Sequence, residues 1–167
     1  MKKVNAAMIG ACLLSLVFSC TKGDISLPDA NTPTRDKPAV ESYRNGGGPY
    51  VLNMVIKLSA EEEVADVNTE TKGLAHLRVS SDKKLYSKVI IQKLAEGDNL
   101  RFAHVHSGPF GMNGPVVITL CATAADFGKN IVIDLTDAQY DFLLNDPAYV
   151  NAHSDFFPPG IVRGQIR

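Results

Sequence analysis

The stretch of sequence that decides the fold is GLAHLRVSSDKKLYSKVIIQKL, residues 73–94. Its first part alternates strictly, so that Ala75, Leu77 and Val79 share one face of an expected β-strand and the residues between them share the other. SSDKK follows and is typical of a tight turn, and LYSKVIIQKL then begins a second apolar run. The stretch therefore predicts a β-hairpin that buries one of its two faces.

Short runs of the same kind recur on both sides of this hairpin. They lie at residues 50–58, 100–106, 115–122, 130–135, 148–154 and 160–167. Residues 136–146 differ, because Thr136 is a good N-cap for a helix and Pro147 prevents its continuation. Seven or eight short strands with one short helix predict an all-β fold, a Greek-key sandwich.

The N-terminus has the form of a processing signal. Lys2 and Lys3 precede an apolar stretch that is too short to span a bilayer, and the stretch ends at Ser19-Cys20. A small residue before cysteine at this place resembles the bacterial lipobox, which implies that residues 1–19 are a lipoprotein signal peptide and that Cys20 is lipidated. An ordinary secretory signal or an uncleaved anchor is the alternative. Because Thr21 is not acidic, we expect a lipid-anchored protein of the bacterial cell envelope, at the outer membrane.

Residues 20–49 are rich in Pro, Gly, Asp, Asn and Thr without apolar periodicity, and they predict a flexible linker after the lipidated cysteine. Residues 50–167 form the expected domain. Cys121 is the one cysteine within it, so no disulfide can form inside the mature chain, and a buried, inert thiol is expected. The formal charge of −1, without a strongly basic segment, gives no sign of a nucleic-acid partner.

Three histidines fall on the face of their expected strands that points away from the core. His104 and His106 fall on one face of the expected strand 100–106, roughly 6.6 Å apart at ~3.3 Å per residue. His153 has the same phase on strand 148–154, opposite small residues that look directed to the core. If the two strands are neighbours, the imidazoles converge into a site that suits copper or zinc, with one position open to water. The alternative is that they are ordinary surface histidines.

Other polar residues are candidates for a supporting role around this site. Arg163 could pair with Glu63 or guide an anion toward the histidines. Asp155 could hydrogen-bond to a metal-binding histidine, bind the metal itself or be a turn residue. His76 lies on a different strand and faces outward. Ser107 and Ser154 adjoin histidines but point to the opposite face, so no catalytic set is visible.

Two segments resemble a known family. AHVHSGPFGMNGPVV (residues 103–117) and YVNAHSDFFPPGIVRGQIR (residues 149–167) resemble the chordin-type (CHRD) domain of many bacterial secreted proteins. The resemblance covers residues 50–167 and implies an immunoglobulin-like sandwich. In animals such domains occur in a secreted antagonist of growth factors, as interaction modules. The sequence departs from the family after Glu63-Val64, where Ala65-Asp66 replaces a proline pair, and this departure bears on the shape of the first hairpin, not on the fold.

His-Val-His on a strand is also similar to copper–zinc superoxide dismutase, whose sandwich is of the same general kind. The chain lacks that enzyme's bridging histidine, zinc-ligand cluster and disulfide, so redox cycling does not follow. We therefore expect a lipid-anchored binding module of the cell envelope with a protein or extracellular ligand as partner. A metalloenzyme, dismutase-like or hydrolytic, and a structural or adhesive domain without metal are the alternatives.

Overall fold

The computed structural model describes residues 40–42 and 50–167, and it confirms the predicted all-β class. The described elements are nine strands, one α-helix and two short 3-10 helices. The strands are β1 Val40–Ser42, β2 Tyr50–Ser59, β3 Lys72–Ser80, β4 Lys84–Gln92, β5 Leu100–Ser107, β6 Val116–Cys121, β7 Ile131–Asp134, β8 Ala148–Ser154 and β9 Val162–Gln165. The helices are η1 Ala60–Glu62, η2 Ala124–Asp126 and α1 Asp137–Asn145.

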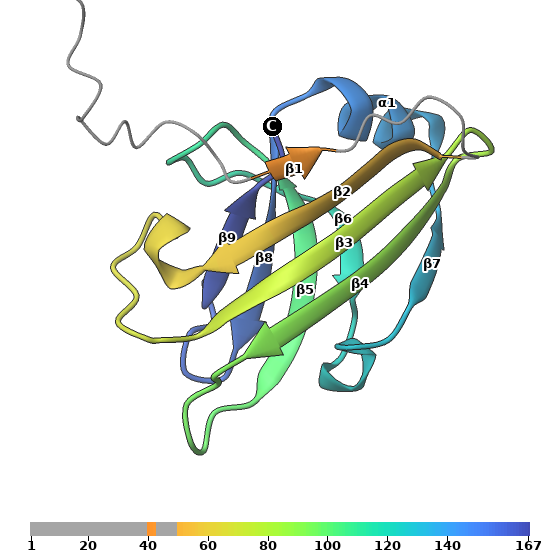
Figure 1. Ribbon diagram of the computed structural model, residues 1–167. Helices are drawn as coiled ribbons and strands as arrows, with labels where there is room; N and C mark the ends of the chain where they lie inside the picture. The colour runs from red at the N-terminus through yellow and green to blue at the C-terminus, as the bar shows by residue number, and fades with distance from the viewer. Residues whose placement is uncertain (1–39, 43–49) are drawn as a thin grey trace, which may run out of the picture. The chain divides into compact units, whose positions relative to one another are not determined.

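The strands form one antiparallel, nearly closed sheet in the order β6-β5-β8-β9-β2-β3-β4-β7, and β1 pairs with β2. β2 meets β9 at a single pair, Ser59 with Arg163, so the sheet folds there into two layers. Figure 1 shows β2, β3 and β4 side by side in one layer, with β5, β8 and β9 behind them. The chain passes from β7 to β8 through α1, which crosses from one layer to the other.

The core lies between the two layers and follows the alternation of the sequence. In β3, Ala75, Leu77 and Val79 are fully buried, whereas the residues between them are at least partly exposed. The predicted hairpin is present, because β3 pairs with β4 over its length. In the second layer Ala103 and Val105 of β5 are also fully buried in the core.

The strands β8 and β9 are buried on both faces, which an alternating pattern does not predict. Two loops cover their outer face, one at residues 108–115 between β5 and β6 and one at residues 155–161 between β8 and β9. Side chains of β5 and β9 bond to backbone carbonyls of the first loop, and His153 of β8 bonds to the second. The outer face of β8 and β9 is therefore buried beneath the two loops, and its buried side chains are largely polar.

The N-terminal predictions fall largely on residues outside the described part. The expected signal peptide, Cys20 and most of the linker lie there, while β1 falls within the residues assigned to the linker. The one α-helix among the described residues, α1, is too short and too polar to cross a bilayer.

Candidate metal centre

The pairing of β5 with β8 brings the three histidines together. The register aligns Phe102 with His153 and His104 with Asn151, so His153 is a diagonal neighbour of His104. On the inner face of the same strands, Ala103 lies opposite Ala152. The condition set by the sequence, that the two strands be neighbours, is therefore met, and all three imidazoles lie on the outer face.

The three rings are close enough to approach one ion. Their candidate ligand atoms all lie within 4.8 Å of one another, and the ring centroids are 5.3 Å apart for His104 and His153 and 5.9 Å apart for His106 and His153. Zinc–nitrogen bonds of ~2.0–2.1 Å place two nitrogens on one ion at most ~4.2 Å apart. A small movement of the rings is thus sufficient for coordination. Among the described residues, no other group of three His, Cys, Asp or Glu side chains gathers in this way.

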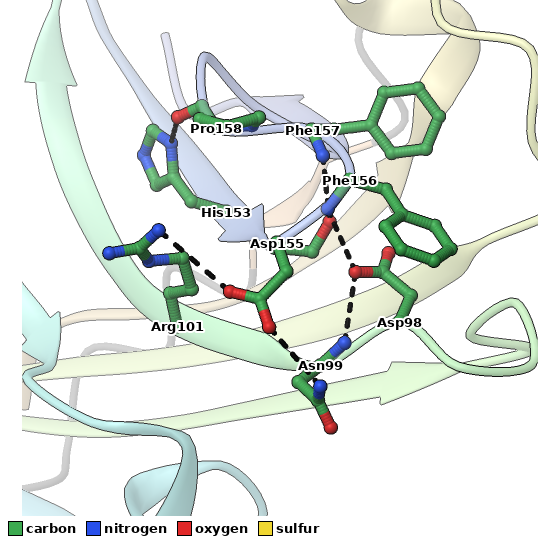
Figure 2. Close-up of polar contacts among 9 residues, drawn as sticks. Asp98, Asn99, Arg101, His153, Asp155, Phe156, Phe157 and Pro158 are labelled. Atoms are coloured by element: carbon green, nitrogen blue, oxygen red, sulfur yellow. Dashed lines mark hydrogen bonds and ion pairs between the residues drawn. The ribbon is translucent and has the colours of Figure 1, made fainter.

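Two of the three rings have a fixed tautomer. Nδ1 of His106 lies 2.9 Å from the carbonyl oxygen of Gly114, and Nδ1 of His153 lies 2.9 Å from that of Pro158 (Figure 2). A carbonyl only accepts, so Nδ1 carries the proton in both rings and Nε2 keeps its lone pair. Both Nε2 atoms are buried and have no hydrogen-bond partner among the described residues.

Burial also keeps the imidazoles neutral. It lowers the pKa of His104 to about 4, with the neighbouring His153 and His106 adding to the effect. Burial is the main cause of the lowered pKa of His106 and of His153 as well, although their bonds to backbone carbonyls act in the opposite direction. The neutral imidazole is the form that binds metal, so the site needs no proton release near pH 7.

Arg163 holds the loop that carries Gly114. Its guanidinium donates to the carbonyl oxygens of Met112 at 2.9 Å and Pro109 at 3.0 Å, and to Oε1 of Gln165 at 3.0 Å. It also stacks on Tyr149, with Cζ 3.5 Å from the ring centroid, and is fully buried. The sequence offered Arg163 as a partner of Glu63 or a guide for anions. In the structure its hydrogen bonds are to loop carbonyls and a side-chain amide.

Glu63 lies at the end of η1 and contacts β8. Its carboxylate oxygens accept from Nδ2 of Asn151 at 3.1 and 3.2 Å. Burial raises the pKa of Glu63 to about 7, against the effects of Asn151 and of the positive charge on Arg163. Asn151 lies opposite His104 in the sheet, so one residue, Asn151, lies between Glu63 and the histidine cluster.

Asp155 turns away from the cluster. Its carboxylate accepts from Nδ2 of Asn99 at 3.1 Å and lies 3.8 Å from the guanidinium of Arg101. Figure 2 shows His153 and Asp155 leaving the end of β8 in different directions, the first toward Pro158 and the second toward Arg101. Asp155 thus has the surroundings of a turn residue.

The remaining candidates lie elsewhere. His76 projects from β3 in the other layer, where it lines a separate small pocket with Arg78 and Lys88. Cys121 is free and buried, and burial, with a further effect of Asp126, raises the pKa of its thiol to about 12. It is therefore an inert core residue, as the sequence predicted.

The sequence did not predict the carbonyls of Gly114 and Pro158 or the tyrosine under Arg163. The signal that could have found the first is the glycine-rich loop itself, because glycine permits a close backbone approach. A Cβ on Gly114 would lie 1.7 Å from the carbonyl oxygen of Ser107. The backbone of Gly114 also donates to the hydroxyl of Tyr149 at 3.1 Å, which ties the loop to β8.

Fold and site together define a β-sandwich domain with a cluster of three neutral histidines on the outer face of one layer. The sequence profile of the CHRD domain family matches residues 54–166, which is well over half of the chain. The chain therefore belongs to the CHRD domain family. No curated protein and no solved structure matches it.

Proposed function

We propose that this protein is a binding module of the bacterial cell envelope that holds one copper or zinc ion through His104, His106 and His153. In this proposal a lipid on Cys20 anchors the chain, at the outer membrane. CHRD membership supports a binding role, and the histidine cluster supports a metal as part of it.

One observation carries the metal proposal. Nε2 of His106 and Nε2 of His153 are buried and have no hydrogen-bond partner in the described part of the chain, while the opposite nitrogen of each ring is held by a carbonyl. An unpaired polar atom in the interior costs free energy, and binding a cation would remove that cost. In metal sites, the ring nitrogen that does not bind the metal usually donates a hydrogen bond that orients the ring and fixes its tautomer, and the two carbonyls accept such bonds here.

Three imidazoles leave at least one coordination position for water or for a group of the bound partner. Neutral nitrogen ligands suit both zinc and copper, and the three rings do not choose between them. The open position is also what a metalloenzyme would need. Dismutase and ester-hydrolysis assays on the metal-loaded chain test that alternative, and catalysis that exceeds that of the free ion and disappears in His153→Ala would replace the binding role.

The metal is tested with the full chain purified without a histidine tag. Calorimetric titration with Cu²⁺ and with Zn²⁺ should show one site for at least one of the two ions, and His106→Ala and His153→Ala should each weaken it about a hundredfold or more. His76→Ala is the matched control, because it removes the fourth histidine from outside the cluster. Absence of a one-to-one complex, or equal affinity in the cluster variants and the control, would support the metal-free adhesive role instead.

The anchor is tested separately. Mass spectrometry of the chain recovered from bacterial membranes should find Cys20 at the N-terminus and acylated, and Cys20→Ala should release the chain from the membrane fraction. More than one acyl chain gives stable attachment. A mature chain that begins at another residue would contradict the lipoprotein proposal without affecting the metal proposal.

A further inference from the structure

Strands β2, β3 and β4 contain five lysine or arginine residues and no acidic residue. The chain as a whole has a formal charge of −1, so these three strands concentrate positive charge, although the strands that pair with their edges add Glu41 in β1 and Asp134 in β7. Among the lysines and arginines of these strands, only Lys84, the first residue of β4, forms an ion pair with a described residue; the other described ion pairs involve Lys83, Lys93 and Arg101.

On the outer face of this layer the sheet register gathers three nitrogen side chains. His76 of β3 lies directly opposite Lys88 of β4, and Arg78 follows His76 on the same face of β3. They line a hollow of about 90 Å³ whose other walls are Tyr86, Ser87 and Asn130. At ~30 Å³ for each water molecule in the liquid, a space of this size holds about three waters, or one small oxyanion.

The guanidinium of Arg78 is held in place without being neutralised. Its Cζ lies 5.1 Å from the ring centroid of Tyr50 and 5.9 Å from that of Tyr86. The two rings are themselves packed edge to face, 5.6 Å apart. Arg78, His76 and Lys88 make no side-chain hydrogen bond or ion pair to a described residue, so their donors remain available.

From this arrangement we infer a second binding site, for a phosphate-type oxyanion, in the hollow between His76, Arg78 and Lys88. The planar guanidinium can donate two parallel hydrogen bonds to one oxyanion, and the ammonium supplies a second charge. Asn130 adds an amide that can donate at the rim. The phosphate group could belong to a soluble ion or to a phospholipid headgroup, since the same donors serve both.

The site is tested by titrating the ¹⁵N-labelled full chain with inorganic phosphate at low ionic strength. Amide signals of Tyr86, Lys88 and Asn130 should shift and saturate. Arg78→Gln and Lys88→Gln should each raise Kd about tenfold or more, because each removes a charge-assisted donor. Lys93→Gln is the matched control, because Lys93 pairs with Glu70 outside the hollow, and its Kd should change less than about twofold.

Vesicles distinguish the two sources of phosphate. If the headgroup is the ligand, vesicles that contain phosphatidylglycerol should retain wild-type chain better than Arg78→Gln, with both chains carrying the same N-terminus, and free phosphate should compete. If the ion is the ligand, both chains should be retained equally while phosphate still binds in solution. Absence of saturable phosphate binding, or an unchanged Kd in both well-folded variants, would overturn the inference.

Discussion

Two of the three imidazoles of the cluster are oriented by a hydrogen bond to a single backbone carbonyl. His106 relies on the carbonyl of Gly114 and His153 on that of Pro158, and both carbonyls come from loops that fold back over the sheet. His104 has no such partner among the described residues, and it is also the most exposed of the three. No hydrogen bond to a described residue therefore fixes the orientation of the His104 ring, which is held by stacking on Phe102 with the ring centroids 4.9 Å apart.

Gly114→Ala tests the role of the loop carbonyl. A Cβ at this position would lie 1.7 Å from the carbonyl oxygen of Ser107, so the loop must move and take the Gly114 carbonyl away from His106. We expect a loss of about 2–3 kcal/mol in unfolding free energy and about tenfold weaker metal binding. Denaturant titration and calorimetry measure the two effects.

Gly128→Ala is the control for this substitution. Gly128 has a φ of +77° but open space around its Cβ position, so alanine there should cost about 1 kcal/mol and leave metal affinity unchanged. Equal metal affinity in Gly114→Ala and wild type would contradict the assigned role of the carbonyl.

Glu63 gives the protein a defined pH dependence. Its pKa is about 7 in the folded chain, above the usual 4.5, so the folded state holds a proton that the unfolded state loses first. Stability from this group is complete below about pH 4.5 and is lost as the pH rises through 7. Glu63→Gln should therefore stabilise the protein by about 1–2 kcal/mol at pH 8 and change little at pH 4.

Thermal unfolding at the two pH values checks this expectation. Glu61→Gln, on the same short helix, is the control because Glu61 is exposed. Glu62, whose pKa burial also raises, contributes in the same direction as Glu63 and stays in place in both variants. A stabilisation by Glu63→Gln that is the same at pH 4 and pH 8 would show that the carboxylate is not the titrating group.

At the level of elements, the loop at residues 108–115 and strand β9 form one unit. Arg163 and Gln165 of β9 reach across the outer face and bond to loop carbonyls, Arg163 to Pro109 and Met112 and Gln165 to Gly108. These hydrogen bonds from β9 hold the loop in place over the outer face, where it covers the histidine cluster.

Arg163→Lys should break this unit. A lysine ammonium cannot replace the forked guanidinium that bonds to two carbonyls and to Gln165, and the site is fully buried. We expect a loss of about 2–4 kcal/mol in denaturant unfolding. Arg101→Lys, at a half-exposed ion pair, should stay within about 0.5 kcal/mol of wild type. Similar losses in the two variants would contradict the support that we assign to Arg163.

The strands and their inward residues were predictable because alternation reports which face of a strand is apolar. Ala75, Leu77 and Val79 followed it, and so did the common face of the three histidines. The buried outer face of β8 and β9 was not predictable, since Arg163 and Gln165 look like solvent-facing residues until the loop covers them. β1 was missed for a different reason, because nothing in its proline- and glycine-rich surroundings has a strand period.

On the scale of the whole molecule, the candidate centre is a product of long-range pairing. β5 and β8 are neighbours in space, although β6, β7 and α1 lie between them in the chain. Periodicity gave the direction of each imidazole but not the partner of each strand, because strand pairing is a property of the complete sheet. The sequence alone could therefore say only that a site would form if the two strands were neighbours, and the structure shows that β5 and β8 are neighbours.

The two layers of the sandwich also differ in character. The β5-β8-β9 layer carries neutral histidines that loops cover, whereas the outer face of β3 and β4 carries, around a hollow, cations that form no ion pair with a described residue. A metal and an anion would thus bind on opposite faces of the molecule, and each can be tested without disturbing the other.

The most direct test of the metal centre is X-ray absorption at the edge of the bound metal, copper or zinc, in the tag-free chain. We expect three imidazole nitrogens at ~2.0–2.1 Å from the metal, with at least one imidazole signal lost in His153→Ala and none lost in His76→Ala. A metal surrounded only by oxygen ligands, or an imidazole count that His153→Ala leaves unchanged, would contradict the proposed metal centre.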